Sequence, residues 1–132
     1  MKKIDIAFIE GGISTPREIE EIKKIRKKAK IIIAFGDCAI KGCIPSIRNW
    51  IPQMESEDLV YPDPSTICST KMLGIGEYVK VDEELKGCPP HRENIIELIK
   101  SAVLKIKPRL RKHPVCVECK FLDNECLITS KN

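Results

Sequence analysis

The segment from Ile4 to Gly36, IDIAFIEGGISTPREIEEIKKIRKKAKIIIAFG, decides the fold. It opens with an apolar run, Ile4–Ile9, which is typical of a buried strand and is followed by glycines that permit a tight turn. It closes with a second apolar run, Ile31–Phe35, of the kind found in parallel strands buried on both faces. With a helix between them, the two runs predict the right-handed strand–helix–strand crossover from which α/β sheets are built.

The expected helix between the two strands has a clear start and an amphipathic pattern. Thr15 is placed to cap it, Pro16 takes the first helical position and Glu18 follows three residues after the cap, which together form a capping box. Apolar residues recur at helical spacing on one face: Ile19, Ile22, Ile25 and Ala29. The other face carries Lys23, Lys24, Arg26, Lys27 and Lys28. We interpret this basic face as a solvated surface, with docking of an acidic partner as the alternative.

The chain beyond Gly36 is less regular. Prolines at positions 45, 52, 62 and 64 predict loops with a short helix for residues 44–70. Tyr78–Val81 is the expected third strand, and a second amphipathic helix carries Ile95–Ile106 and ends before Pro108. We therefore expect an α/β core at residues 1–106 and a cysteine-rich, metal-binding tail at residues 107–132.

The composition excludes several classes of protein. The length of 132 residues fits one small domain, and 42% hydrophobic with 32% charged residues is ordinary for a globular protein. No apolar run approaches the ~18 residues that a membrane span needs, and Met1-Lys2-Lys3 does not open a signal peptide, so we expect a cytoplasmic protein. A net charge of +4 with few aromatic residues indicates no nucleic-acid site.

Cysteine is the unusual residue type in this chain. An odd number of cysteines without an export signal argues against a disulfide framework and favours thiolates that bind metal. The seven are Cys38, Cys43, Cys68, Cys88, Cys116, Cys119 and Cys126.

Three glycine-containing loops follow the expected strands: Glu10–Gly12, Gly36–Cys38 and Gly87–Cys88. Because ligands of open α/β sheets bind at the carboxyl ends of the strands, Cys38 and Cys88 should lie on the same rim. Glycine beside each cysteine lets backbone N–H groups approach cluster sulfurs, and these hydrogen bonds help to set a reduction potential. From spacing alone, both cysteines could equally be small buried hydrophobic residues.

The three loops also resemble a known family. The residues that carry the likeness are Ile4–Thr15, Ala34–Ala39 with Gly42, and Gly87-Cys88-Pro89-Pro90. They resemble the small subunit of nickel–iron hydrogenases, closest to the sulfhydrogenase and viologen-reducing branch, and the related small cluster-bearing subunit of NADH:ubiquinone oxidoreductase. The likeness extends over about residues 4–128, apart from residues 52–76.

The resemblance implies a flavodoxin-like fold, a parallel sheet with helices on both faces. It also implies that Cys38 and Cys88 each provide one ligand to a proximal [4Fe–4S] cluster. Glu10 matches a family position near the cluster, where it would take part in proton or electron passage or would only satisfy loop amides.

Two departures from the family pattern affect this site. The family supplies two further ligands from a Cys-x-x-Cys loop in an N-terminal strand unit that this chain does not contain. A separate polypeptide could supply that half, the sequence could be a fragment, or the cluster could be assembled differently. Cys43 stands where the family usually has glycine, so Cys38, Cys43, Cys68 and Cys88 could form a four-thiolate set for a cluster or for zinc. Otherwise Cys43 and Cys68 are packing thiols.

The tail has its own metal-ligand spacing, His113-x-x-Cys116-x-x-Cys119 followed by Cys126. Three thiolates and one imidazole suit either an iron–sulfur cluster or tetrahedral zinc. In the resembling hydrogenases the corresponding stretch begins a cluster-binding extension. His113 is the candidate fourth ligand, with a surface histidine as the alternative.

These observations predict a non-catalytic electron-transfer subunit of a hydrogenase-like oxidoreductase. By resemblance, its partners would be a large catalytic subunit, an electron carrier, and polypeptides that supply the missing Cys-x-x-Cys half or further iron–sulfur or flavin centres. The alternative is a redox-inert assembly or binding module of the same fold, stabilised by zinc. A flavin-binding domain is a third hypothesis, but no phosphate-cradling loop supports it.

Overall fold

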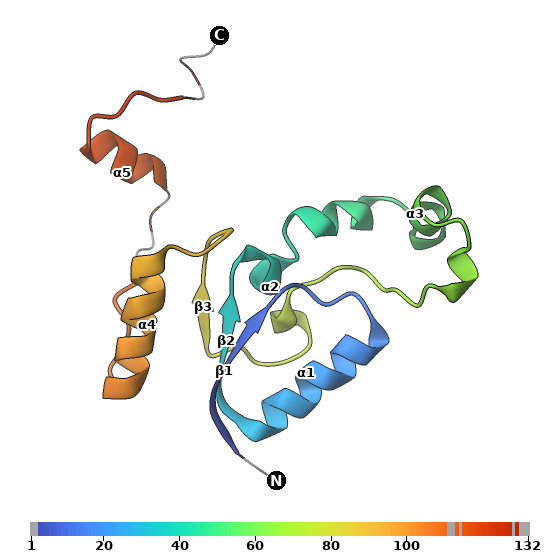
Figure 1. Ribbon diagram of the computed structural model, residues 1–132, viewed down its shortest axis with the longest axis horizontal. Coiled ribbons are helices and arrows are strands. Elements are labelled where there is room, and N and C mark those ends of the chain that lie inside the picture. Colours follow the sequence, from blue (N-terminus) through green and yellow to red (C-terminus); the bar gives the residue numbers. More distant parts are fainter. Residues whose placement is uncertain (1–2, 111–112, 114, 128, 130–132) are drawn as a thin grey trace. The chain divides into compact units, whose positions relative to one another are not determined.

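The computed structural model describes residues 3–110, 113, 115–127 and 129. The chain divides into two compact units, Met1–Ile95 and Ile96–Asn132, and the boundary falls within α4. In chain order, the elements of the structure are β1 (Ile4–Glu10), α1 (Pro16–Lys28), β2 (Ala29–Phe35), α2 (Asp37–Lys41), η1 (Ile44–Trp50), α3 (Gln53–Val60), η2 (Pro64–Thr66), η3 (Ile75–Glu77), β3 (Glu83–Leu85), α4 (Arg92–Leu104) and α5 (Val115–Phe121), the three η elements being 3-10 helices (Figure 1).

The sheet is parallel, as the sequence predicts. Its three strands lie in the order β1-β2-β3, and both strand pairs are parallel. Ile6 lies beside Ile31 in the β1–β2 pair, and Ile33 lies beside Glu83 in the β2–β3 pair. The predicted α/β class and the first crossover are therefore confirmed.

Helix α1 begins with the predicted capping box. The backbone N–H of Glu18 donates to Thr15 Oγ1 at 3.2 Å, and the N–H of Thr15 donates to Glu18 Oε2 at 3.0 Å. These bonds satisfy amides that the first turn of a helix leaves without partners.

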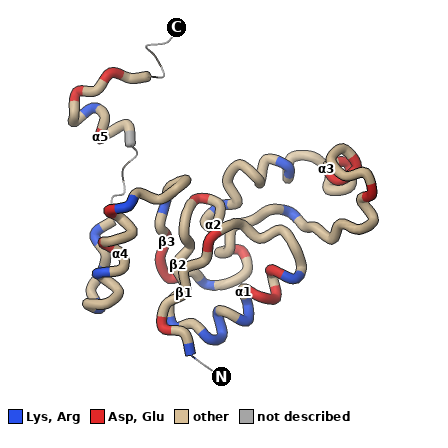
Figure 2. The backbone as a smooth tube through the Cα atoms, viewed as in Figure 1, with Lys and Arg blue, Asp and Glu red and all other residues tan. Residues whose placement is uncertain are grey.

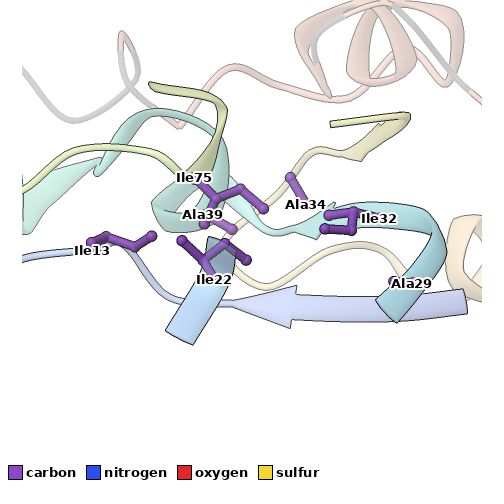
Figure 3. Packing of buried hydrophobic residues seen from close by; sticks show 7 residues of the cluster. All are labelled: Ile13, Ile22, Ala29, Ile32, Ala34, Ala39 and Ile75. Atoms are coloured by element: carbon purple, nitrogen blue, oxygen red, sulfur yellow. The ribbon is translucent and has the colours of Figure 1, made fainter. Parts of the chain in front are cut away.

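One apolar cluster joins α1 to the strands and to the segment around η3. Burying each large aliphatic side chain contributes roughly 1.5–3 kcal/mol. Ile32 and Ile75 are fully buried, and Ile22 brings α1 onto the same cluster. Figure 3 shows its seven buried members: Ile13, Ile22, Ala29, Ile32, Ala34, Ala39 and Ile75.

The predicted third strand is wrong in position. Residues 78–81 follow η3 and do not belong to the sheet, which the chain joins as β3 at Glu83–Leu85. Tyr78, Val79 and Val81 instead pack against the apolar cluster from an irregular segment. The apolar character of residues 78–81 therefore reflects core packing, whereas the real strand consists of Glu-Glu-Leu and has no strong strand signal.

The segment between β2 and β3 consists of short helices and loops, as the prolines predict. Asn49 holds Met72 in place within this segment. The Asn49 Nδ2 donates to the carbonyl of Met72 at 2.7 Å, and the Asn49 Oδ1 accepts from the Met72 N–H at 2.8 Å. Arg48 Nη2 donates to the carbonyl of Thr70 at 2.6 Å. These bonds tie Thr70 and Met72 to η1.

The second unit contains most of α4 and all of α5. The predicted helix over Ile95–Ile106 is observed as α4, Arg92–Leu104, and it ends before Pro108 as expected. Within the described ranges, no helix combines the length and the apolar character needed to cross a membrane.

The basic residues of α1, blue in Figure 2, do not all have the role predicted from the sequence. The side chain of Arg26 is only 24% exposed, and it donates hydrogen bonds to the carboxylate of Asp82 at 2.6 Å and to the carbonyls of Ala29 and Lys30. Asp82 also accepts from the N–H of Ile32 at 2.8 Å. Arg26 therefore ties the end of α1 to the chain just before β3, whereas Lys23, Lys24, Lys27 and Lys28 are exposed as predicted.

We expect the contribution of Asp82 to stability to depend on pH. The hydrogen bond from Arg26, and then the one from the Ile32 N–H, hold the pKa of Asp82 below its usual value of 3.8. A carboxylate whose pKa is lowered in the folded state stabilises the fold at pH values above its usual pKa. This contribution is lost as the pH falls through the folded-state pKa. Asp82→Asn should lower the free energy of unfolding by about 1–2 kcal/mol at pH 7.

Denaturant unfolding of the wild type and of Asp82→Asn at pH 7 and pH 3 tests this expectation. The gap between the two proteins should shrink at pH 3. Asp5→Asn is the control, because Asp5 pairs with Lys30 on the surface and should matter little. An equal gap at both pH values would contradict the explanation.

Candidate metal centre

Backbone hydrogen bonds bring the loops after β2 and β3 together at the carboxyl ends of the strands. The N–H of Gly36 donates to the carbonyl of Leu85 at 2.8 Å. The N–H of Asp37 donates to the carbonyl of Gly87 at 3.0 Å, and in return the N–H of Gly87 donates to Asp37 Oδ1 at 3.0 Å. This reciprocal pair ties the loop of Cys38 to the loop of Cys88.

Glycine is required at two points of this contact. Gly36 has φ of 86°, and a Cβ there would lie 3.3 Å from the carbonyl oxygen of Gly87. Gly87 has φ of 130°, and a Cβ there would lie 2.6 Å from the Cα of Pro90. The two loops therefore pack more closely than residues with side chains would allow.

Cys38 lies in α2 and is half-buried. Burial raises the pKa of its thiol, and the neighbouring Cys43, Cys88 and Glu10 raise it further, with a contribution from a hydrogen bond between the Cys38 and Cys43 side chains. Cys38, Cys43, Cys88 and Glu10 therefore share one electrostatic environment. Without a metal this environment favours the neutral thiol of Cys38, whereas a bound metal deprotonates the cysteines that coordinate it.

Cys43 has a backbone conformation that is unusual for its residue type. Its φ is 47° and its ψ is −138°, directly after Gly42 with φ of 78°. A residue with a Cβ pays roughly 1–3 kcal/mol for such a conformation. Ser46 holds the turn, since both its N–H and its hydroxyl donate to the carbonyl of Cys43, at 3.0 and 2.6 Å.

The Gly11-Gly12 turn places Glu10 at the same rim. Glu10 is the exposed last residue of β1. A Cβ at Gly12 would lie 3.2 Å from the carbonyl oxygen of Cys38 and 2.5 Å from the sulfur of Met72. The thioether of Met72 therefore covers this turn. The sequence did not indicate this position, because Met72 lies in the irregular segment between β2 and β3, which has no clear hydrophobic periodicity.

Asp37 is a second residue that the sequence reasoning missed. The sequence shows an acidic residue at the start of a short helix, directly before Cys38. It could not show the hydrogen-bond partner of this residue, because Gly87 is fifty positions away. The hydrogen bond between them is a product of the fold.

The other predicted ligands belong to other segments of the chain. Cys68 is exposed and is not among the described groups that act on Cys38. In the second unit, Cys116 and Cys119 lie about one turn apart on α5, and Cys126 follows it and is exposed. His113 lines a hollow with Glu118, Phe121 and Leu122.

No set of three or more His, Cys, Asp or Glu side chains among the described residues is arranged to hold a metal ion. The structure therefore brings Cys38, Cys43, Cys88 and Glu10 into one neighbourhood without arranging them around one point. Ligation by any of the seven cysteines, and by His113, stays a prediction.

Comparison with known proteins shows that the chain is similar to subunits of hydrogenases. The chain matches the family described as "NADH ubiquinone oxidoreductase, 20 Kd subunit" over residues 1–102. It is 30% identical to the sulfhydrogenase 2 subunit delta of Pyrococcus furiosus, over 98% of this chain and 54% of the relative. It is 36% identical to a subunit of the F420-non-reducing hydrogenase vhu of Methanocaldococcus jannaschii, over 88% of this chain and 44% of the relative.

A solved structure shows the same similarity. A chain in the crystal structure of an NAD+-reducing [NiFe]-hydrogenase in the H2-reduced state matches 85% of this chain and 71% of its own length. The TM-score is 0.77 at 28% sequence identity. The chain spans about half the length of the curated relatives that it matches.

Proposed function

We propose a function from one premise: the chain belongs to the family of the NADH ubiquinone oxidoreductase 20 kDa subunit. It acts as an iron–sulfur electron-transfer subunit of a hydrogenase-like complex in the cytoplasm. The relatives that support this proposal are named as hydrogenase subunits. The observation that carries it is the pair of reciprocal Asp37–Gly87 hydrogen bonds, which ties the loop of Cys38 to the loop of Cys88.

The rim carries two of the four thiolate donors that a [4Fe–4S] cluster needs. Thiolates are the usual ligands of such clusters, and Cys38 and Cys88 stand on loops whose glycines leave room for close approach. When bound, the cluster supplies one-electron redox chemistry. The chain's own residues hold it, partly bury it and set its surroundings through loop amides and the charge of Glu10.

The proposed partners follow from what the rim lacks. Two thiolates do not complete a four-ligand cluster, so the remaining ligands would come from another cysteine of this chain, from a part of the protein outside the given sequence or from another polypeptide. The subunit would pass electrons between a large catalytic subunit and an electron carrier. The loops at Glu10–Thr15, Cys38–Ile47 and Cys88–Arg92 are the surface we assign to these contacts.

We assign a second metal centre to the tail. Cys116, Cys119 and Cys126, with His113 as a fourth donor, provide the soft ligands for an iron–sulfur cluster or for zinc. Zinc alone, in a colourless and redox-inert protein, is the alternative function.

Metal and sulfide analysis of the anaerobically purified full chain tests the relay. We expect a brown protein with about four iron and four sulfide per site. Colourless protein with one zinc would overturn the relay and support the zinc-stabilised module.

Cys88→Ser should remove the iron held at the rim and leave the fold intact, because Cys88 is exposed in a loop. Cys68→Ser is the matched control, since Cys68 is also exposed but is not among the described groups that act on Cys38. Iron content and far-ultraviolet circular dichroism are the measurements. Unchanged iron in Cys88→Ser would count against Cys88 as a ligand.

A further inference from the structure

We propose that the 3-10 helix η1 presents an apolar stripe, made of Ile44, Ile47 and Trp50, on which the large catalytic subunit of the complex docks. This inference rests on the proposed function, because it assigns a docking surface to one of the proposed partners. The complementary surface of that partner would be an apolar hollow with Lys or Arg side chains beside it.

The stripe follows from the geometry of η1. A 3-10 helix has about three residues per turn, so side chains at positions i and i+3 lie above one another. Ile44, Ile47 and Trp50 have this spacing along η1, which connects α2 to α3 (Figure 1). Their exposed fractions are 71%, 64% and 90%, and η1 contains no buried residue. The large apolar side chains of η1 therefore form one row that faces solvent.

The polar side chains of η1 hold its other faces to the first unit. Arg48 donates to the carbonyl of Thr70 at 2.6 Å, and Asn49 bonds to both main-chain groups of Met72. A surface helix normally packs its apolar face on the protein and leaves its polar face in water, so η1 has the reverse arrangement. The helix cannot roll to bury its stripe without breaking these bonds. An apolar row held outward in this way is typical of a surface that a partner covers.

The place and the composition of the stripe favour the catalytic subunit as this partner. The stripe begins within the Cys38–Ile47 surface that we assign to subunit contacts, and exposed Ile51 and Met54 continue it. Transient electron-transfer contacts are small, whereas interfaces between permanent subunits are larger and more hydrophobic. Tryptophan is also enriched among the residues that contribute most to binding. A permanent subunit therefore fits the stripe better than an electron carrier does.

The charges beside the stripe indicate which residues would complement it. Acidic side chains outnumber basic ones in residues 42–70, whose charged residues are Arg48, Glu55, Glu57, Asp58 and Asp63. This excess contrasts with the net charge of +4 of the whole chain. It favours a partner surface that carries Lys or Arg around its apolar part. It disfavours an anionic membrane surface, which attracts basic segments.

The test is the affinity of the full chain for the purified catalytic subunit, measured by isothermal titration calorimetry. Trp50→Ala should weaken binding about 30-fold or more, as expected of a central aromatic anchor, and Ile47→Ala about fivefold or more. Val103→Ala is the matched control, because Val103 is an exposed aliphatic residue of α4, and it should change the affinity less than about twofold. All three side chains are exposed, so circular dichroism should match that of the wild type.

Equal binding of the catalytic subunit by the wild type and by Trp50→Ala would overturn the docking surface and leave the proposed function standing. Analytical ultracentrifugation of the full chain alone tests for a second copy. A wild-type dimer that Trp50→Ala converts to a monomer would assign the stripe to self-association and overturn the proposal. Trp50-dependent cosedimentation with phosphatidylcholine vesicles would overturn it in favour of a lipid surface. If the wild type does not bind the catalytic subunit, this assignment and the proposed partnership fail together.

Discussion

Gly74→Ala should destabilise the first unit by about 3 kcal/mol or more, the largest folding effect we expect from a single methyl group. A Cβ at Gly74 would overlap the backbone carbonyl of Ile40 and would lie 2.9 Å from the amide nitrogen of Lys41. Both contacts are with the main chain of α2, which cannot rotate away as a flexible side chain can. Relief would require α2 to separate from Ile75, which is fully buried.

Gly76→Ala is the matched control, two residues further along the chain. A Cβ there would meet only Val81 Cγ2 at 4.0 Å, which is ordinary contact, so the change should stay within about 0.5 kcal/mol. Urea unfolding of the full chain, followed by circular dichroism, compares the two variants. Equal losses would show that the close approach at Gly74 does not control stability. Because α2 carries Cys38, Gly74→Ala should also weaken iron binding.

The parts of the fold that could be predicted have local signals. The strand at β1, the capping box of α1 and the apolar run of β2 are each encoded in neighbouring residues, and all three are confirmed. Strand β3 has no such signal, because its sequence is Glu-Glu-Leu and its place is set by pairing with β2 and by the Asp82–Arg26 contact. The apolar residues at 78–81 misled the prediction because a core-facing loop and a strand look alike in sequence.

Only the part of the candidate site that depends on the order of the strands in the sheet could be predicted. Strand ends on one side of a parallel sheet meet, so the meeting of the Cys38 and Cys88 loops was expected, although the strand before Cys88 is Glu83–Leu85 and not residues 78–81. The contact of Cys43 with Cys38, the cover provided by Met72 and the clamp from Asp37 to Gly87 depend on turns and on hydrogen bonds between distant residues. Such contacts leave no periodic pattern in the sequence.

Asp37→Ala should lower the affinity of the rim for iron by about 10–100-fold, the usual cost of losing a residue that orients metal ligands. Its carboxylate accepts the Gly87 N–H at 3.0 Å, directly beside Cys88. Alanine removes this acceptor and leaves only the bond from the Asp37 N–H to the Gly87 carbonyl. The Cys88 loop should then lose half of its reciprocal tie to α2. Asp37 is a positioning residue, so its loss should weaken cluster retention without removing a ligand.

Asp37→Asn separates the hydrogen bond from the charge, because its amide keeps an acceptor oxygen where Oδ1 stands. We expect Asn to retain most of the iron under a timed chelator challenge in which Ala loses it rapidly. Both variants should unfold within about 1–2 kcal/mol of the wild type, since one partly exposed hydrogen bond is at stake. Iron loss from Ala no faster than from the wild type would show that the clamp does not position Cys88. Equal loss from Ala and Asn would assign the effect to the charge of Asp37 instead.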